Sequence, residues 1–328
     1  MEVRLSGGDD RNLMERLLEK QIPLSNSCNG KGTCGKCKVR VVSGTITDVT
    51  DTERRLLTEK EVAGCMRLAC MTKARGEVVI ETGEGEEDHV FTTGGVEGHF
   101  ERDADKHGYG LAVDIGTTTV VATLVNMDDG TEGATYAQIN PQKTYGLDVL
   151  TRITYETEYK EKAITQLQEA IVHGLNEAIK GICAEAGIDV TQIGEIDIAA
   201  NCTMLHMLAG VDARPIGRAP YKPAFTDGQK LKARDLGLIG AADAMVYLLP
   251  SVSAYIGADI VAGVYVCDLR HSPGKTLFID IGTNGELVLE AGGKMYSCSC
   301  AAGPALEGMN ITSCMRAAKG AVEDVHIG

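Results

Sequence analysis

Two stretches of this chain repeat each other at long range. LAVDIGTTTVVATLV at residues 111–125 aligns with LFIDIGTNGELVLEA at residues 277–291, an offset of 166 residues. In both copies an apolar strand ends at an aspartate, a Gly-Thr turn follows, and a second strand begins. A long-period internal match indicates duplicated lobes, and duplicated lobes create a site between them. This repeat constrains the fold more strongly than any local pattern does.

Around the first copy, the elements follow the order of one layered α/β lobe. Three strands precede helical periodicity over 147–187, and strand–helix pairs follow: EIDIAAN with CTMLHMLAG, then MVYLLP with SAYIGADIVAGVYVCDL. Asn201, between the first of these strands and its helix, is expected to cap that helix. A second lobe of equal size would need about 100 residues beyond residue 328. We therefore expect the second lobe to be incomplete in this chain.

A cysteine-rich loop, SCNGKGTCGKCKV, lies in the N-terminal part of the chain. Cys28, Cys34 and Cys37 have the spacing C-x5-C-x2-C, and GCMRLACM offers Cys65 or Cys70 as a fourth ligand. Structural zinc usually takes its ligands as two separated pairs. Three sulfurs in one loop and one from elsewhere suit a [2Fe–2S] cluster instead. Zinc binding and thiol–disulfide exchange remain the alternatives.

The residues around these cysteines agree with a cluster. Cys70 is preferred over Cys65 because it stands just before a strand, EVVIET, whose rigid backbone would hold the sulfur. Glycines in the loop let the backbone fold around a cluster and point N–H groups at sulfur, and basic residues offset its negative charge: Gly30, Gly32, Gly35, Lys31, Lys36, Lys38 and Arg40. The cysteines in apolar contexts are expected to be buried structural thiols: 183, 202, 267, 298, 300 and 314.

The two repeated turns have the chemistry of phosphate-binding loops. The N–H groups and hydroxyls of such a turn face anionic oxygens, while the aspartate holds Mg²⁺ through water. A single copy would also be consistent with an ordinary hairpin turn. The pair resembles the phosphate loops of the acetate kinase, sugar kinase, Hsp70 and actin superfamily. The matching residues are Asp114, Gly116, Thr117 and Thr118 in the first loop and Asp280, Gly282, Thr283 and Asn284 in the second.

Composition and charge exclude several classes of function. With 32 basic and 46 acidic residues the net charge is −14, so sequence-independent binding of nucleic acid is disfavoured. No apolar run approaches the length of a membrane span. The N-terminus lacks the pattern of a secretory signal, and eleven cysteines without such a signal indicate a reducing cytoplasm.

The first part of the chain, CNGKGTCGKCKVRVVSG followed by RLACM, resembles an adrenodoxin-type or bacterial [2Fe–2S] ferredoxin of the β-grasp fold. Together with both DIGT loops it resembles the reductive activators of corrinoid proteins. That resemblance implies ATP-coupled transfer of one electron from the cluster to the Co(II) corrinoid of a methyltransferase system, with Asp114 and Asp280 as catalytic residues. It implies a [2Fe–2S] cluster, ATP and Mg²⁺ as cofactors. The implied partners are a corrinoid protein and an upstream electron donor, and a homodimer is possible.

The expected organisation is a β-grasp ferredoxin domain at 1–84, a linker at 85–108, an RNase H-like lobe at 109–272 and an incomplete second lobe at 273–328. We expect the polar, glycine-rich linker to be sensitive to proteases. The adenosine-binding segment of the superfamily would lie beyond residue 328, so we expect weak ATP binding by this chain. Two other functions stay open: a plain electron carrier with a scaffold lobe, and a small-molecule kinase with a sensor cluster.

Overall fold

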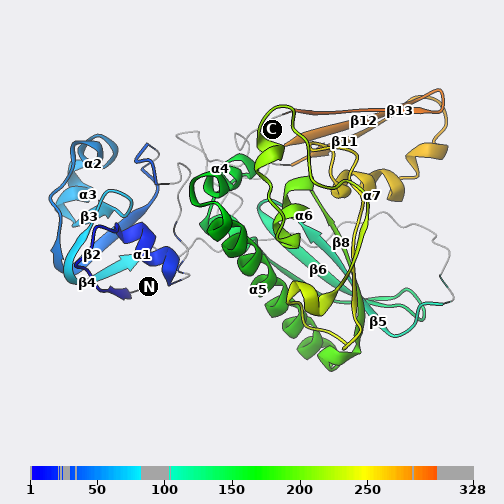
Figure 1. The fold of residues 1–328 in the computed structure, drawn as a ribbon, viewed down its shortest axis with the longest axis horizontal. Coiled ribbons are helices and arrows are strands. Elements are labelled where there is room, and N and C mark those ends of the chain that lie inside the picture. Colours follow the sequence, from blue (N-terminus) through cyan, green and yellow to red (C-terminus); the bar gives the residue numbers. More distant parts are fainter. Residues whose placement is uncertain are drawn as a thin grey trace, which may run out of the picture. The chain divides into compact units, whose positions relative to one another are not determined.

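The computed structural model describes residues 2–20, 22, 24, 30–33, 35–82, 103, 105–282 and 284–300 (Figure 1). The chain forms two compact units, one of residues 1–88 with 142–155, the other of residues 89–141 with 156–328. Most of the linker expected at 85–108 lies outside the described residues.

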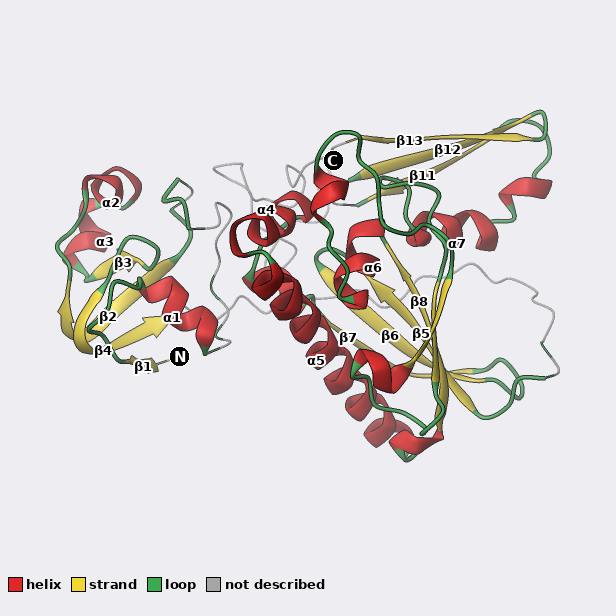
Figure 2. Cartoon of the chain, viewed as in Figure 1, coloured by secondary structure: helices red, strands yellow, loops and turns green. Residues whose placement is uncertain are grey.

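The N-terminal unit contains an antiparallel four-stranded sheet in the order β1-β4-β2-β3 (Figure 2). Its strands are β1 (Glu2–Leu5), β2 (Lys38–Ile46), β3 (Met66–Leu68) and β4 (Ala74–Thr82). Its helices are α1 (Leu13–Glu19), α2 (Asp51–Leu56) and α3 (Glu59–Ala63). Leu13 and Leu17 of α1 belong to the same fully buried core as Val39 of β2 and Ile80 of β4. Burial of these side chains joins the helix to the sheet.

The structure has two short helices over residues 51–63. Each begins with its own capping box: Thr50 accepts a hydrogen bond from the N–H of Glu53, and Thr58 from that of Glu61. A capping box marks a helix start. The second box therefore begins a new turn of helix after Leu57, whose backbone is extended.

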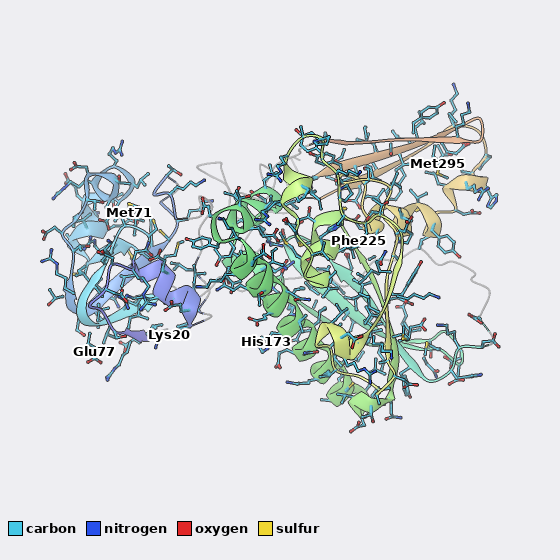
Figure 3. The ribbon with its side chains drawn as sticks, in the orientation of Figure 1. Lys20, Met71, Glu77, His173, Phe225 and Met295 are labelled. Atoms are coloured by element: carbon cyan, nitrogen blue, oxygen red, sulfur yellow. The ribbon has the colours of Figure 1, made fainter. Side chains whose placement is uncertain are left out.

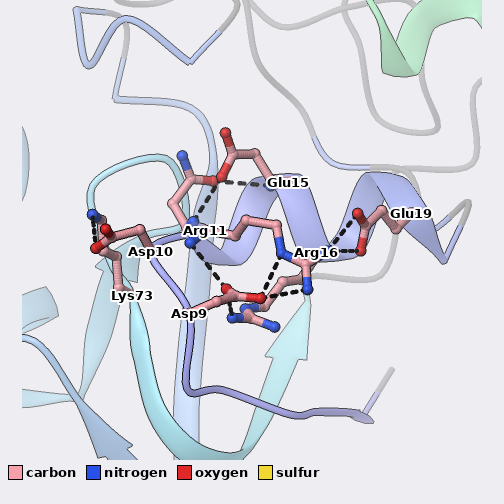
Figure 4. Close-up of polar contacts among 8 residues, drawn as sticks. Asp9, Asp10, Arg11, Glu15, Arg16, Glu19 and Lys73 are labelled. Atoms are coloured by element: carbon pink, nitrogen blue, oxygen red, sulfur yellow. Dashed lines mark hydrogen bonds and ion pairs between the residues drawn. The ribbon is translucent and has the colours of Figure 1, made fainter. Parts of the chain in front are cut away.

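Polar contacts fix the start of α1 (Figure 4). Asn12 caps the helix by accepting from the N–H of Glu15 at 2.9 Å, and the Glu15 carboxylate accepts from the N–H of Asn12 at 2.8 Å. Asp9, just before the helix, forms ion pairs with Arg11 and Arg16. The exposed charges lower the pKa of Asp9 to about 2, chiefly through its hydrogen bonds to Arg11.

The second unit is built on a six-stranded sheet in the order β7-β6-β5-β8-β10-β9. Its strands are β5 (Tyr109–Ile115), β6 (Thr119–Asn126), β7 (Glu132–Ile139), β8 (Ile193–Ala200), β9 (Gln229–Lys232) and β10 (Met245–Leu248). β5, β8 and β10 run parallel, whereas β6, β7 and β9 are antiparallel to their neighbours. The βββαβαβ order of an RNase H-like lobe is confirmed, and β9 is an edge strand that the sequence pattern did not predict.

The long helix expected over 147–187 is divided in two. α4 (Val149–Tyr159) and α5 (Glu161–Ala186) meet at Lys160, whose φ of 52° is left-handed. The buried face of α5 packs against β6 and β7. The sheet's other helices are α6 (Cys202–Ala209), α7 (Ala258–Val266) and five short 3-10 turns at 141–144, 190–192, 214–217, 233–236 and 269–271.

A three-stranded antiparallel sheet ends the described part of the chain. It consists of β11 (Thr276–Ile281), β12 (Gly285–Ala291) and β13 (Lys294–Cys300). β11 and β12 are the second copy of the repeat, and they have the same hairpin topology as β5 and β6. Phe278 and Val288 of this sheet pack with Ile260 of α7.

The expectation that the remaining cysteines are buried is right for two of the five that the structure describes and wrong for three. Cys183 and Cys202 are buried, whereas the thiols of three others are exposed: Cys267, Cys298 and Cys300. Two of these lie on β13, which is the edge of its sheet among the described residues. Residue 314 lies outside the described residues. In the part of the chain that the structure describes, none of the helices is both long and apolar enough to cross a membrane.

Candidate cluster and phosphate sites

The first candidate site is a pair of thiols in the N-terminal unit. The Sγ atoms of Cys37 and Cys70 lie 3.2 Å apart, and both cysteines are buried. Two sulfurs bound at about 2.3 Å to one tetrahedral metal ion lie about 3.8 Å apart, so these two thiols are placed to share an ion. Cys28 and Cys34 lie outside the described residues. The four-cysteine ligand set therefore stays a prediction.

The backbone joins the two thiols as well. Cys37 precedes β2 directly, and its carbonyl accepts a hydrogen bond of 2.8 Å from the N–H of Ala69, next to Cys70. Cys65 has a different environment: it is exposed, and its carbonyl accepts from the N–H of Val41 in β2. This contrast favours Cys70 as the fourth ligand.

The glycines of the cysteine loop are there for steric reasons. Gly30 and Gly32 have φ values of 79° and 69°, in the left-handed region that side chains avoid. A Cβ added to Gly30 would lie 2.8 Å from Cε of Met14, and one added to Gly32 would lie 2.9 Å from Cε of Met71 (Figure 3). Gly30 and Gly32 therefore lie close to Met14 and Met71, which belong to the same core as Cys70. These glycines, with the buried Cys37 and Cys70, fit the tightly folded backbone that a cluster requires.

The second candidate site lies where the two repeated hairpins end. Asp114 is the last residue but one of β5, and Asp280 has the same position in β11. Burial, together with the charges of Asp259 and Asp280, raises the pKa of Asp114 to about 6. Asp114 keeps exposed surface, so it is a carboxyl in a site that is open to solvent on one side. The structure thus brings Asp114 and Asp280 into the same electrostatic neighbourhood.

Two acidic residues that the sequence reasoning missed join this site. Asp259, in the first turn of α7, has its pKa raised by burial and by Asp280. Glu286 in β12 pairs directly with Asp280 and accepts a hydrogen bond of 3.1 Å from the Ser299 hydroxyl. Burial raises the pKa of Glu286 to about 7, and the charges of Asp259 and Asp280 add to the rise. A divalent cation or a proton would relieve this crowding of negative charge.

The position of Glu286 follows from a one-residue difference between the two turns. In the first hairpin Ile115 pairs with Val120, whereas in the second Ile281 pairs with Gly285, so the second turn is one residue shorter. Such a slip moves the following side chains to the other face of the strand. Aligned by the repeat, Glu286 corresponds to buried Val120, yet it faces the carboxylate of the repeated aspartate.

The first turn is held by two asparagines. Asn140 donates from Nδ2 to the carbonyl of Gly116 at 2.8 Å, and from its backbone N–H to the carbonyl of Thr118 at 2.8 Å. Asn201 donates to the hydroxyl of Thr117 at 3.1 Å. Asn201 also caps α6 by accepting from the N–H of Met204 at 3.0 Å, as expected. Its contact with the turn was not predicted.

Less of the second turn is described. The N–H of Gly282 donates to the carbonyl of Asn284 at 3.0 Å, which closes the turn after β11. Thr283 lies outside the described residues. Within the described part of the chain, no three His, Cys, Asp or Glu side chains are arranged to hold a metal ion by themselves. The phosphate-binding roles of both turns remain predictions.

Comparison with known protein families first gives the class of the chain. Residues 2–75 match the 2Fe-2S iron–sulfur cluster binding domain, and residues 274–328 match the C-terminal domain of RACo, the ASKHA domain. The protein is thus an iron–sulfur-domain protein with an actin-like ASKHA part. Residues 109–272, which are half of the chain, match the RACo middle region. The chain therefore belongs to the RACo family of reductive activators of corrinoid proteins.

Individual relatives agree with this family. The chain is 35% identical over 221 residues to the corrinoid activation enzyme RamQ of Eubacterium limosum, covering 67% of this chain and 37% of that protein. It is 25% identical over 226 residues to the [Co(II) methylated amine-specific corrinoid protein] reductase of Methanosarcina barkeri, covering 66% of this chain and 40% of the reductase. A solved reductive activator for a corrinoid, iron–sulfur protein matches with a TM-score of 0.61 at 28% identity, covering 95% of this chain and 64% of that structure.

Proposed function

We propose that this chain is a [2Fe–2S] electron donor that reactivates the Co(II) corrinoid of a methyltransferase system, coupled to ATP binding or hydrolysis. The observation that carries the proposal is the pair of buried thiols of Cys37 and Cys70, 3.2 Å apart, in a chain of the RACo family. The match to a cluster-binding domain over residues 2–75 supports the cluster. The two relatives, a corrinoid activation enzyme and a corrinoid protein reductase, support the partner.

In this proposal Cys28, Cys34, Cys37 and Cys70 hold the cluster. A bound [2Fe–2S] cluster supplies one-electron chemistry at a potential set by its ligands and surroundings. The protein's own contribution at this site is to bury Cys37 and Cys70 away from water. An upstream electron donor would reload the protein between turnovers. The reducing cytoplasm is the compartment that suits a chain with eleven cysteines.

The carboxylates of the second unit are proposed as the nucleotide site. Asp114 and Asp280 would hold Mg²⁺ through water. Asp259 and Glu286 lie close enough to interact electrostatically with these two carboxylates. Mg²⁺ usually keeps several waters and is held by one or two carboxylates plus phosphate oxygens. This is consistent with a site in which no ready-made set of ligands is present among the described residues. A nucleotide can drive electron transfer here only by binding two states of the protein differently.

The proposal is tested with anaerobically purified protein and a Co(II) corrinoid protein. We expect about two irons and two sulfides per chain, and reduction of cobalt to Co(I) that is faster with Mg-ATP than without it. Stoichiometric zinc without iron would overturn the cluster assignment. Electron transfer at the same rate with and without ATP would instead identify a plain electron carrier. Phosphate transfer from ATP to a small molecule, with no cobalt reduction, would indicate a kinase.

A further inference from the structure

A carboxylate with six hydrogen bonds lies in the interior of the N-terminal unit. Glu53 of α2 is completely buried. Its Oε1 accepts from Nε of Arg67 at 2.9 Å, the N–H of Leu68 at 3.1 Å and the hydroxyl of Thr72 at 3.1 Å. Its Oε2 accepts from Nη2 of Arg67 at 2.9 Å and from the N–H and hydroxyl of Thr50 at 2.9 and 3.0 Å.

The residues that bind this carboxylate flank one cysteine on both sides. Leu68 stands two residues before Cys70, and Thr72 stands two residues after it. The turn between them is closed by a 2.9 Å hydrogen bond from the N–H of Met71 to the carbonyl of Leu68. The Thr72 hydroxyl shares its single proton between that carbonyl, at 2.9 Å, and Oε1 of Glu53. Glu53 therefore accepts hydrogen bonds from both ends of the turn that carries Cys70.

The same turn is joined to the second thiol. The N–H of Ala69, inside the turn, donates to the carbonyl of Cys37 at 2.8 Å. A displacement of the turn would thus change the 3.2 Å separation between the sulfurs of Cys37 and Cys70. Arg67, the ion-pair partner of Glu53, is also held in place, because its guanidinium donates to the carbonyls of residues 47 and 48 at 2.8 and 3.1 Å.

We propose that Glu53 is a positioning residue for the cluster, which holds the Cys70 sulfur in register with the Cys37 sulfur. This inference rests on the proposed cluster and adds a residue outside the ligand set. An ordinary buried ion pair contributes little to stability on balance. Here the carboxylate of Glu53 binds the N–H of Leu68 and the hydroxyl of Thr72, on either side of Cys70. We therefore expect the loss of this carboxylate to change the position of the Cys70 sulfur, in addition to any change in stability.

Replacement of Glu53 by Gln tests this role. The amide has one acceptor oxygen, and its NH₂ group would face donors of Arg67 or Thr50 where the second carboxylate oxygen accepted. Changes in groups that orient metal ligands typically cost about 10–100-fold in metal affinity. We therefore expect Glu53→Gln to release iron to a chelator at least about tenfold faster. The electron paramagnetic resonance signal of the reduced cluster should change as well.

The control is Glu61→Gln in the neighbouring helix. Glu61 has the same position in a Thr-x-x-Glu capping box, where its carboxylate accepts from the N–H and hydroxyl of Thr58 at 2.7 and 2.9 Å. Its other partner is Lys38, and none of its hydrogen bonds among the described residues reaches the Cys70 turn. This variant loses the same cap and the same negative charge. It should release iron at the wild-type rate.

A second variant keeps the test open if Glu53→Gln does not fold. Thr72→Val removes the hydroxyl that joins Glu53 to Leu68 and preserves the side chain's shape. It should accelerate iron release in the same direction, by less than Glu53→Gln, at temperatures where circular dichroism shows the full chain folded. Wild-type release rates and spectra in folded Thr72→Val and Glu53→Gln would overturn the positioning role. Wild-type protein that binds no iron would instead overturn the proposed cluster.

Discussion

A buried carboxyl in the second unit makes stability depend on pH in a way that can be calculated. Glu156 of α4 is fully buried, and its Oε2 accepts a hydrogen bond of 2.9 Å from the N–H of Ala213. Its Oε1 has no hydrogen-bond partner among the described residues. Burial raises the pKa of Glu156 to about 7, while the N–H of Ala213 acts in the opposite direction.

The sign and size of the effect follow from linkage. The folded state binds the proton more tightly than the unfolded state, because the pKa of Glu156 rises from 4.5 to about 7 on folding. The favourable contribution is therefore complete below pH 4.5 and is lost as the pH rises through about 7. The full difference corresponds to about 3 kcal/mol, and the part that falls between pH 5 and pH 8 to about 2.5 kcal/mol.

Glu156→Gln removes this dependence, because an amide stays neutral at every pH. Between pH 5 and pH 8, wild-type protein should lose about 2.5 kcal/mol more unfolding free energy than the variant. The comparison of slopes is cleaner than that of absolute stabilities, since the amide NH₂ would be as poorly paired as the Oε1 atom. Equilibration in urea followed by a short pulse of alkylation at the buried thiols of Cys183 and Cys202 reports on this unit specifically.

The matched control is Glu161→Gln. Glu161 pairs with Arg214 at the surface, and its side chain is 84% exposed. This variant removes one negative charge from the same region without removing a buried one, so its pH dependence should follow that of wild-type protein. Equal slopes in wild-type protein and Glu156→Gln would refute the reasoning, because they would mean that Glu156 titrates as it does in the unfolded chain.

Cys70→Ser should remove the visible absorbance of anaerobically purified protein, whereas Cys65→Ser should keep it. Gly30→Ala should lower the iron content, because φ there is 79° and the added methyl would collide with a buried side chain. Asp280→Asn should abolish ATP hydrolysis, measured as phosphate release, and leave the cluster's absorbance unchanged. Asn201→Ala should lower the unfolding free energy in urea by about 1 kcal/mol or more, since it removes a helix cap and a contact to Thr117 in the turn after β5.

Local sequence patterns predicted the elements that are set by neighbouring residues. The strands around both aspartates follow from apolar alternation bounded by Gly-Thr turns. The break between α2 and α3 went unpredicted although it was legible, since Thr50 and Thr58 each stand three residues before a glutamate. The break between α4 and α5 was not, because Lys160 is neither glycine nor proline, and its left-handed backbone is imposed by the tertiary structure.

The candidate sites show the same division between local and long-range information. The cysteine spacing is a local signal, and it led to the buried pair of Cys37 and Cys70. Glu286 could not be found in this way, because the repeat aligns it with a buried valine on the opposite face of the hairpin. Its place beside Asp280 depends on a turn shortened by one residue, which pairs Ile281 with Gly285. In a duplicated hairpin, the length of the turn therefore decides which side chain lies opposite the repeated aspartate. A residue-by-residue alignment of the two copies misses Glu286, because only the second copy places an acidic residue there.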